Sequence, residues 1–277
     1  MALLSSRSAS SGCASADRHG RCPREVVPVG PLATVLGVGE RDWVERDWVD
    51  WHQLYDIPGS MLARRLATVQ DRISDALDTA PPGPLRAISM CAGQGRDLLT
   101  VLERHRRGGD VTARLVDLDP GNVAVAWQRA ADAGLKKVEA VAGDASLIDA
   151  YDGMVPAGLV LACGVFGNIT DADIARTISY LPALCSPGAT VVWTRHRRPP
   201  DLVPFVCDCF TEQQFELAWL SDPAEQFGVG VHRFAGRSRP LPRGERLFTF
   251  VGRKKLERHA SSRSGSASRQ QRDEDRD

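Results

Sequence analysis

A short segment with two glycines, Cys91-Ala92-Gly93-Gln94-Gly95-Arg96-Asp97, is well suited to binding a ligand. This glycine turn (residues 91–97) follows an apolar run and precedes a helical pattern that begins at Arg96 or Asp97. Glycine permits a tight turn and lets a ligand approach the backbone without a Cβ in the way. Free N–H groups at the start of a helix receive anionic groups such as carboxylate or phosphate. We therefore expect the glycine turn to hold the charged part of a small molecule.

A carboxylate stands where a nucleoside-binding fold needs one. Asp117 lies 22 residues after Gly95, at the end of a second apolar run, and Asp119 follows closely. An acid at this place can accept hydrogen bonds from both hydroxyls of a ribose. A dinucleotide dehydrogenase would use the same pattern, but the chain has no third glycine to complete GxGxxG and no Tyr-x-x-x-Lys pair. The pattern indicates nucleoside binding and disfavours NAD.

Alternating strand-like and helical segments must position these residues. Strands are expected at residues 85–90, 113–117, 138–142, 159–163 and 190–194, and helices at 97–105, 122–133 and 171–184. This alternation predicts right-handed crossovers and a parallel sheet covered on both faces. After a helix near residues 212–219, the runs 229–234 and 246–251 are expected to form a β-hairpin. A parallel sheet that ends in a hairpin is not the usual plan of a dehydrogenase.

Residues 40–80 are expected to form a helical cap before the sheet. An apolar stripe recurs at helical spacing through Val44, Trp48, Trp51 and Tyr55. A second helix should begin after Ser60 as its N-cap. Its buried face should carry Leu62, Leu66, Val69, Ile73 and Leu77. Core packing is the favoured role of the stripe, and a lid over the ligand is the alternative. Residues 1–39 and 254–277 lack periodicity and are expected to be disordered ends of a main domain at 81–253.

From Leu85 to Val251 the chain resembles the class I S-adenosylmethionine-dependent methyltransferases. The resemblance rests on four segments in the family's order: the glycine turn, Asp117, Gly143-Asp144-Ala145, and the segment from Cys163 to Ile169. It implies a Rossmann-like, three-layer α/β/α sandwich. The sheet would have seven strands, mostly parallel, with a C-terminal antiparallel hairpin, and two helices would precede it.

The same resemblance assigns residues to the cofactor S-adenosylmethionine. Ala92, Gly93 and Gly95 would line its methionine part, Asp117, with Asp119 just beyond, would hold the ribose, and Asp144 with Ala145 would meet the adenine. Cys163 begins the loop that would face the sulfonium and the methyl acceptor. The segment from Trp51 to Ser60 resembles the N-terminal part of bacterial members, where Tyr55 or Arg64 would close over the methionine carboxylate.

Two positions depart from the family pattern. The family begins its first motif with an acid and a glycine, whereas this chain has Ser89 and Cys91. Ser89 supplies no negative charge near the cofactor's ammonium group. We therefore keep two hypotheses: a methyltransferase, and a binding or regulatory protein that retained the cofactor site without turnover.

Methyl transfer requires little from side chains, because the sulfonium is already activated and a base is needed only when the acceptor must lose a proton. Arg195, His196 and Asp201 follow the fifth strand and are expected at the carboxyl end of the sheet. His196 is a candidate base, because neighbouring arginines would disfavour its cation. Asn168, in the loop after the fourth strand, is a second candidate. A solvated basic loop is the alternative interpretation, and neither His52 nor His232 is assigned a role.

Composition limits the partners. Lys plus Arg and Asp plus Glu both number 35, so no net charge attracts nucleic acid or an anionic membrane. The stretch Cys163-Gly164-Val165-Phe166 is unlike the Asn-Pro-Pro-Tyr tetrad of methylases that act on planar nitrogens. We therefore expect a small-molecule acceptor. The seven cysteines have no framework spacing, and Cys207-Asp208-Cys209 lacks a second ligand pair, so we expect reduced thiols and no metal. No run of about 18 apolar residues occurs, which predicts a cytoplasmic protein.

Overall fold

A computed structural model describes residues 53–251 of the 277-residue chain, with side chains from Tyr55 onward. The expected disordered ends, most of the apolar stripe (Val44, Trp48 and Trp51) and His52 lie outside the described residues. Tyr55 lies in a single 3-10 turn, η1 (Gln53–Asp56). Of the expected cap, the described residues therefore contain this turn and the helix that follows it.

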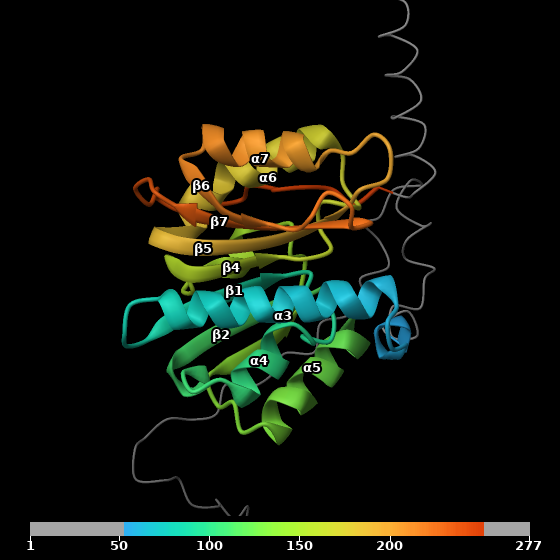
Figure 1. Ribbon diagram of the computed structural model, residues 1–277. Coiled ribbons are helices and arrows are strands. Elements are labelled where there is room, and N and C mark those ends of the chain that lie inside the picture. The colour runs from blue at the N-terminus through green and yellow to red at the C-terminus, as the bar shows by residue number, and fades with distance from the viewer. Residues whose placement is uncertain (1–52, 252–277) are drawn as a thin grey trace, which may run out of the picture. The chain divides into compact units, whose positions relative to one another are not determined.

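Seven strands form one sheet in the order β3-β2-β1-β4-β5-β7-β6 (Figure 1). In chain order they are β1 (Leu85–Met90), β2 (Val111–Asp117), β3 (Val138–Ala142), β4 (Ala157–Ala162), β5 (Cys185–His196), β6 (Phe215–Leu220) and β7 (Phe227–Phe234). Strands β1 to β5 pair in parallel, and β7 is antiparallel to both of its neighbours, β5 and β6. The strand order reverses between β1 and β4. In open α/β sheets, ligands bind at the carboxyl ends of the strands beside such a reversal.

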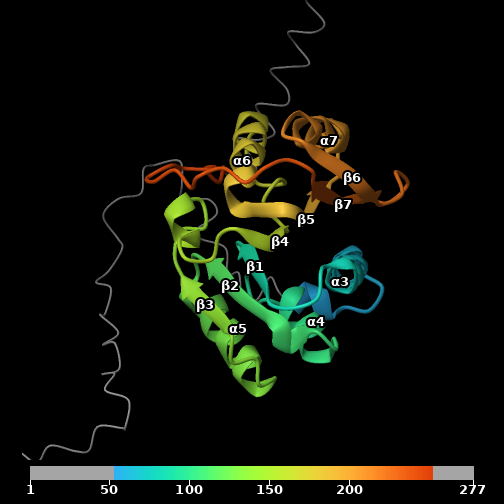
Figure 2. The same cartoon turned by 90° about the vertical axis from the view of Figure 1, so that its left-hand side faces the viewer.

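Helices cover both faces of the sheet (Figure 2). One face carries α3 (Met61–Thr79), α4 (Leu98–Arg104) and α5 (Pro120–Asp132), and the other carries α6 (Asp171–Leu184) and α7 (Val203–Glu212). Neighbouring residues of a strand point to opposite faces, so Ala87 belongs to the core beneath α3 and Ile88 to the core beneath α6. Because both faces are buried, the central strands are apolar along most of their length. These layers match the expected α/β/α sandwich.

Several elements have the bounds expected from the sequence. Strands β1 and β3 and helix α6 begin and end as predicted. Ser60 is the N-cap of α3, because its Oγ accepts a hydrogen bond of 3.1 Å from the Ala63 N–H. In α3, Val69, Ile73 and Leu77 are buried as expected, whereas Leu62 and Leu66 are half-buried.

The hairpin is formed by different residues from those expected. Residues 215–220, which overlap the predicted helix 212–219, form strand β6. This strand pairs with β7, and the helix before it is α7. Apolar residues in Phe215–Leu220 fit a period of two as well as a helical period, so the pattern was ambiguous. Asp222 closes the connecting turn by accepting the Ala224 N–H at 2.8 Å. The predicted pairing of 229–234 with 246–251 is therefore wrong.

Residues 244–251 instead form an extended strap that returns to the carboxyl edge of the parallel strands (Figure 2). This C-terminal strap pairs with the loop after β3, where Ile148 N–H bonds the Glu245 carbonyl at 3.0 Å and Leu247 N–H bonds the Ser146 carbonyl at 2.8 Å. Its last described residue, Val251, donates its N–H to the carbonyl of Asn168 at 3.0 Å. The strap therefore connects the loops that follow β3 and β4.

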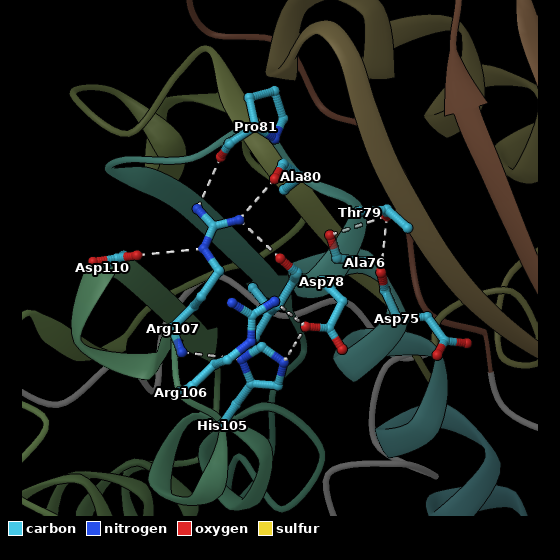
Figure 3. Close-up of polar contacts among 11 residues, drawn as sticks. Asp75, Ala76, Asp78, Thr79, Ala80, Pro81, His105, Arg106, Arg107 and Asp110 are labelled. Carbon is cyan, nitrogen blue, oxygen red and sulfur yellow. Dashed lines mark hydrogen bonds and ion pairs between the residues drawn. The ribbon is translucent and has the colours of Figure 1, made fainter.

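A buried arginine anchors the end of α3 to the sheet (Figure 3). Arg107 donates to the carbonyls of Leu77 and Ala80, both at 2.8 Å, and to those of Pro81 and Gly83, both at 2.9 Å. These carbonyls belong to the last turn of the helix and the loop after it, where the helix offers no N–H partner. The contact fixes where α3 ends and β1 begins. Within residues 53–251, no helix is both long and apolar enough to span a bilayer.

Candidate active site

The glycine turn has a left-handed backbone at three alternate positions. Cys91, Gly93 and Gly95 have φ values of 49°, 53° and 65°. A Cβ on Gly95 would lie 2.6 Å from a methyl carbon of Leu115 and 2.8 Å from one of Leu99. Gly95 is therefore required both by its conformation and by the packing of α4 on β2. Cys91 takes the same kind of conformation with a side chain, at the position where the resembled family has glycine.

Asp117 joins the end of β2 to the glycine turn. Its Oδ2 accepts the Gly93 N–H at 2.8 Å and its Oδ1 accepts the Asp119 N–H at 3.0 Å. The Asn122 side chain is a further hydrogen-bond donor to this carboxylate. Burial raises the pKa of Asp117, and these donors act in the opposite direction. The predicted ribose acid thus stands beside the glycine turn.

Asp119, expected as a second cofactor residue, has a structural role. Its Oδ1 accepts the N–H groups of Gly121 at 2.7 Å and Asn122 at 3.1 Å, so Asp119 is the N-cap of α5. The exposed side chain between the two acids, Leu118, retains 43% of its accessible area. Sequence reasoning missed Leu118, although an apolar residue directly after the ribose acid was a signal for it.

The loop after β3 brings Asp144 and Ala145 to the same edge. Asp144 Oδ1 accepts the Ser146 N–H at 2.9 Å and the Ser146 hydroxyl at 2.6 Å, and its Oδ2 accepts a hydrogen bond of 2.9 Å from Arg246. Ala145 is buried, and its carbonyl accepts the Tyr151 hydroxyl at 2.6 Å. Arg246 comes from the C-terminal strap, far away in sequence, and was not anticipated.

Side chains form hydrogen bonds to backbone groups of the loop that begins at Cys163. Gly164 N–H donates to Thr194 Oγ1 at 2.9 Å, and the Gly164 carbonyl accepts from the Asn168 amide at 2.7 Å. The guanidinium of Arg195 donates to the Phe166 carbonyl. Phe166 is fully buried against Trp193, so its ring belongs to the core. The exposed Asn168 side chain is thus partly engaged in shaping its own loop.

Among the candidate bases, His196 lies against this loop. A Cβ built on Gly167 would be 3.5 Å from the imidazole Cδ2 of His196, whose Nδ1 accepts the Arg198 N–H at 3.3 Å. Asp201 is engaged elsewhere, because it accepts the Val203 N–H at 2.9 Å and pairs with Arg197 at 2.8 Å. Arg197 is thus not part of a merely solvated basic loop.

Two neighbouring arginines on α3 have different partners. Arg64 is half-exposed and lies 3.7 Å from Glu225. The neighbouring residue Arg65 is half-buried and donates to the Tyr55 hydroxyl at 2.7 Å. Arg64 and not Arg65 was expected from the sequence, although Arg65 lies three residues after Leu62 and four before Val69, a spacing that places all three on one face of α3. Arg65, and not Arg64, therefore contacts Tyr55.

The carboxyl group of Asp97 and the thiol of Cys163 lie close enough to Arg65 for its positive charge to affect their pKa values. Burial raises the pKa of Asp97 and raises that of Cys163 well above its usual value, and the positive charge of Arg65 acts in the opposite direction on both. Ser89, in contrast, is buried within β1 between Leu115 and Leu161. Asp97 also caps α4, because its Oδ1 accepts the Leu98 N–H at 2.7 Å.

No protein-family model matches the sequence, and no characterised protein sequence matches it. Solved structures with a similar fold include a possible exported protein from Bordetella parapertussis, with a TM-score of 0.56 at 17% identity, over 69% of this chain and 80% of that one. The CurJ carbon methyltransferase has a TM-score of 0.54 at 15% identity, over 69% of this chain and 59% of that one, so the chain spans about three-fifths of CurJ.

Magnesium protoporphyrin IX methyltransferase (ChlM) from Synechocystis PCC 6803, solved with bound S-adenosylmethionine, has a TM-score of 0.53 at 14% identity. The match covers 70% of this chain and 94% of that one. Together with the strand order and the antiparallel β7, these similarities identify the fold as that of the class I S-adenosylmethionine-dependent methyltransferases.

Proposed function

We propose that the protein transfers a methyl group from S-adenosylmethionine to a small molecule. The observation that carries this proposal is the tie between Asp117 and Gly93 at the carboxyl ends of β1 and β2. This hydrogen bond holds a carboxylate against a glycine turn beside the reversal of strand order, which supports assigning Asp117 to the ribose. The acceptor is proposed to be small because the chain carries no net charge and no nucleic-acid motif.

The residues at the methionine end match a zwitterion. We assign the cofactor's carboxylate to Arg65, with Tyr55 as its hydrogen-bonded partner. We assign its ammonium group to the second carboxylate oxygen of Asp97, whose Oδ1 caps α4 by accepting the Leu98 N–H at 2.7 Å. Ala92, Gly93 and Gly95 offer a backbone without large side chains, and Cys163 adds the wall at the end of β4. In this proposal Arg65 and Asp97 bind the two charged groups of the methionine part, and they compensate for Ser89, which stands where the family has an acid.

The residues at the nucleoside end have complementary chemistry. Asp117 would bind the ribose hydroxyls, and Asp144 would accept the adenine amino group. The exposed side chain of Leu118 offers an apolar surface for one face of the adenine. Asp119 lies just beyond this set and caps α5 through its Oδ1.

When bound, the cofactor supplies an activated methyl group on its sulfonium, so the chain's own residues orient the acceptor and exclude water. The loop from Cys163 to Ile169 is the proposed wall for the acceptor, fixed by Thr194 and Arg195. His196, beside Gly167, is the proposed proton acceptor for substrates that must lose a proton. Asn168 retains its amide oxygen for contact with the acceptor.

Calorimetry on the full chain tests the cofactor assignment. We expect S-adenosylhomocysteine to bind at micromolar concentration and NAD not to bind. Arg65→Ala should weaken this binding by about tenfold, because it removes a charge-assisted hydrogen bond. Arg64→Ala, one residue earlier on the same helix, is the matched control and should change it by less than about twofold. Binding of NAD alone, or equal losses in both variants, would contradict the assignment.

A cofactor-binding protein without turnover is the second candidate, favoured by Ser89 in place of the family's acid. Incubation with methyl-labelled S-adenosylmethionine and a metabolite extract separates the two. Transfer of label to a small molecule, with release of S-adenosylhomocysteine, supports the enzyme. Tight binding without release over many hours supports the second candidate.

A further inference from the structure

A closed polar network connects the C-terminal strap to the predicted adenine loop. Arg246 Nη1 donates to Asp144 Oδ2 at 2.9 Å and also to the Ser146 hydroxyl oxygen. Ser146 in turn donates both its N–H and its hydroxyl to Asp144 Oδ1. Ser146 is buried, whereas Asp144 and Arg246 remain partly accessible at the carboxyl edge of the sheet.

This network leaves Asp144 little freedom as an acceptor. A carboxylate offers about four lone-pair directions. Two on Oδ1 are used by Ser146 and one on Oδ2 is used by Arg246. The remaining acceptor direction therefore lies on Oδ2, the oxygen that Arg246 holds. The direction in which this remaining lone pair of Asp144 Oδ2 points depends on the position of Arg246.

The backbone fixes the position of Arg246. Residues Leu147 and Arg246 form an antiparallel bridge, and the flanking hydrogen bonds join Ile148 to Glu245 and Leu247 to Ser146. Leu247 is fully buried, which holds the strap against the core on this side. The backbone that carries the Arg246 guanidinium is therefore held in place by these hydrogen bonds.

We propose that Arg246 is a positioning residue that orients Asp144 toward the 6-amino group of adenine, so that the strap sets the base selectivity of the cofactor site. This inference rests on the proposed function. Ion pairs as exposed as Arg246–Asp144, whose side chains retain 47% and 36% of their accessible area, contribute little to stability. A role in recognition accounts better for an arginine supplied from 102 residues away.

The affinities for two ligands distinguish a positioning role of Arg246 from a purely structural one. S-adenosylhomocysteine carries the 6-amino group, and its analogue with unsubstituted purine in place of adenine does not. By calorimetry, Arg246→Ala should lower the affinity for S-adenosylhomocysteine by about tenfold and the affinity for the purine analogue by less than about twofold. Arg246→Lys should restore part of the selectivity. Arg243→Ala, which removes an exposed arginine paired with Asp152 just before the strap, is the matched control and should alter neither affinity.

Equal losses for both ligands in Arg246→Ala would overturn the inference, because they would show general damage to the site. Equal affinity of the wild-type protein for both ligands would overturn it as well, while leaving the proposed function intact. Failure of the wild-type protein to bind either ligand would instead refute the proposed function, and this inference with it.

Discussion

His232 is fully buried among aromatic rings on β7. Its Nδ1 accepts the Trp193 indole N–H at 3.0 Å, and its ring stacks on Phe210 with centroids 4.2 Å apart. Its Nε2 is buried without a hydrogen-bond partner. Burial lowers the pKa of His232 from 6.5 to about 4, so the neutral ring is the folded form. This residue serves the core and not the active site.

The lowered pKa of His232 predicts a pH dependence of stability. Between pH 6.5 and about 4, the unfolded chain binds a proton at this residue and the folded chain does not. The free energy of unfolding should therefore decrease as pH falls through this window, by up to about 3 kcal/mol from this residue. In urea unfolding at several pH values, His232→Gln should show a shallower dependence than the wild type. Parallel curves would contradict this explanation.

Substitutions at two glycines with nearly equal φ angles distinguish the cost of backbone strain from the cost of overpacking. Gly95 and Gly134 have φ values of 65° and 67°, but only a Cβ on Gly95 would meet neighbouring atoms. Gly134→Ala should cost about 1–2 kcal/mol from the left-handed backbone alone. Gly95→Ala should cost roughly 2 kcal/mol more, because the new methyl group overpacks the core. Denaturant unfolding measures both, and equal losses would show that Leu99 and Leu115 move aside freely.

Residues of the site could be predicted from the sequence where their signals are local. The glycine turn and Asp117 follow apolar runs at a spacing typical of nucleoside-binding folds, so both were predicted. Arg246 could not be, because its contact with Asp144 spans 102 residues and depends on the path of the strap. Arg65 and Arg64 are adjacent in sequence, and only the rotation of α3 distinguishes them.

At the scale of elements, the position of α3 depends on Arg107, which binds four carbonyls in the last turn of the helix and the loop after it. Figure 3 shows its contacts with Ala80 and Pro81. The next residue, Gly108, has no room for a side chain, because a Cβ there would lie 1.9 Å from the Leu102 carbonyl oxygen. Since α3 carries Arg65, this anchor also helps to place the residue proposed for the cofactor's carboxylate.

Loss of this anchor should destabilise the fold. Arg107→Ala leaves several partly buried carbonyls without donors and should lower the free energy of unfolding by about 2–4 kcal/mol. The adjacent Arg106, whose side chain is 73% exposed and pairs with Asp78, is the control. Arg106→Ala should change stability by less than about 1 kcal/mol. Similar losses in the two variants would show that Arg107 is no more important than a surface residue.

Elements were predictable where one periodicity dominated. The strands β1 and β3 and helix α6 have clear patterns and clear ends. The segment from Phe215 to Leu220 fits two periods, and its choice of strand depends on β7, which offers a free edge for pairing. The strap resembles a strand in sequence, but β6 occupies that edge of β7 and the strap pairs with the loop after β3 instead.

At the scale of the whole described domain, the two halves of the site lie on opposite sides of one reversal in the sheet. The loops after β1 to β3 carry the residues proposed for the glycine turn, the ribose and the adenine, and the loops after β4 and β5 carry those proposed for the acceptor. Arg65 on α3 and Cys163 after β4 complete the proposed methionine end. The strap crosses this division, because it bonds both Ser146 and Asn168. It thus provides a physical connection between the cofactor half and the acceptor half.

The late position of the strap in the chain has a consequence for biosynthesis. A ribosome completes all seven strands before it adds Arg246, so a nascent chain can form the sheet while the loop around Asp144 still lacks its arginine and its backbone partners. The nucleoside end would mature only when the final described residues emerge from the exit tunnel. Acquisition of ligand affinity during translation would then lag behind acquisition of the fold.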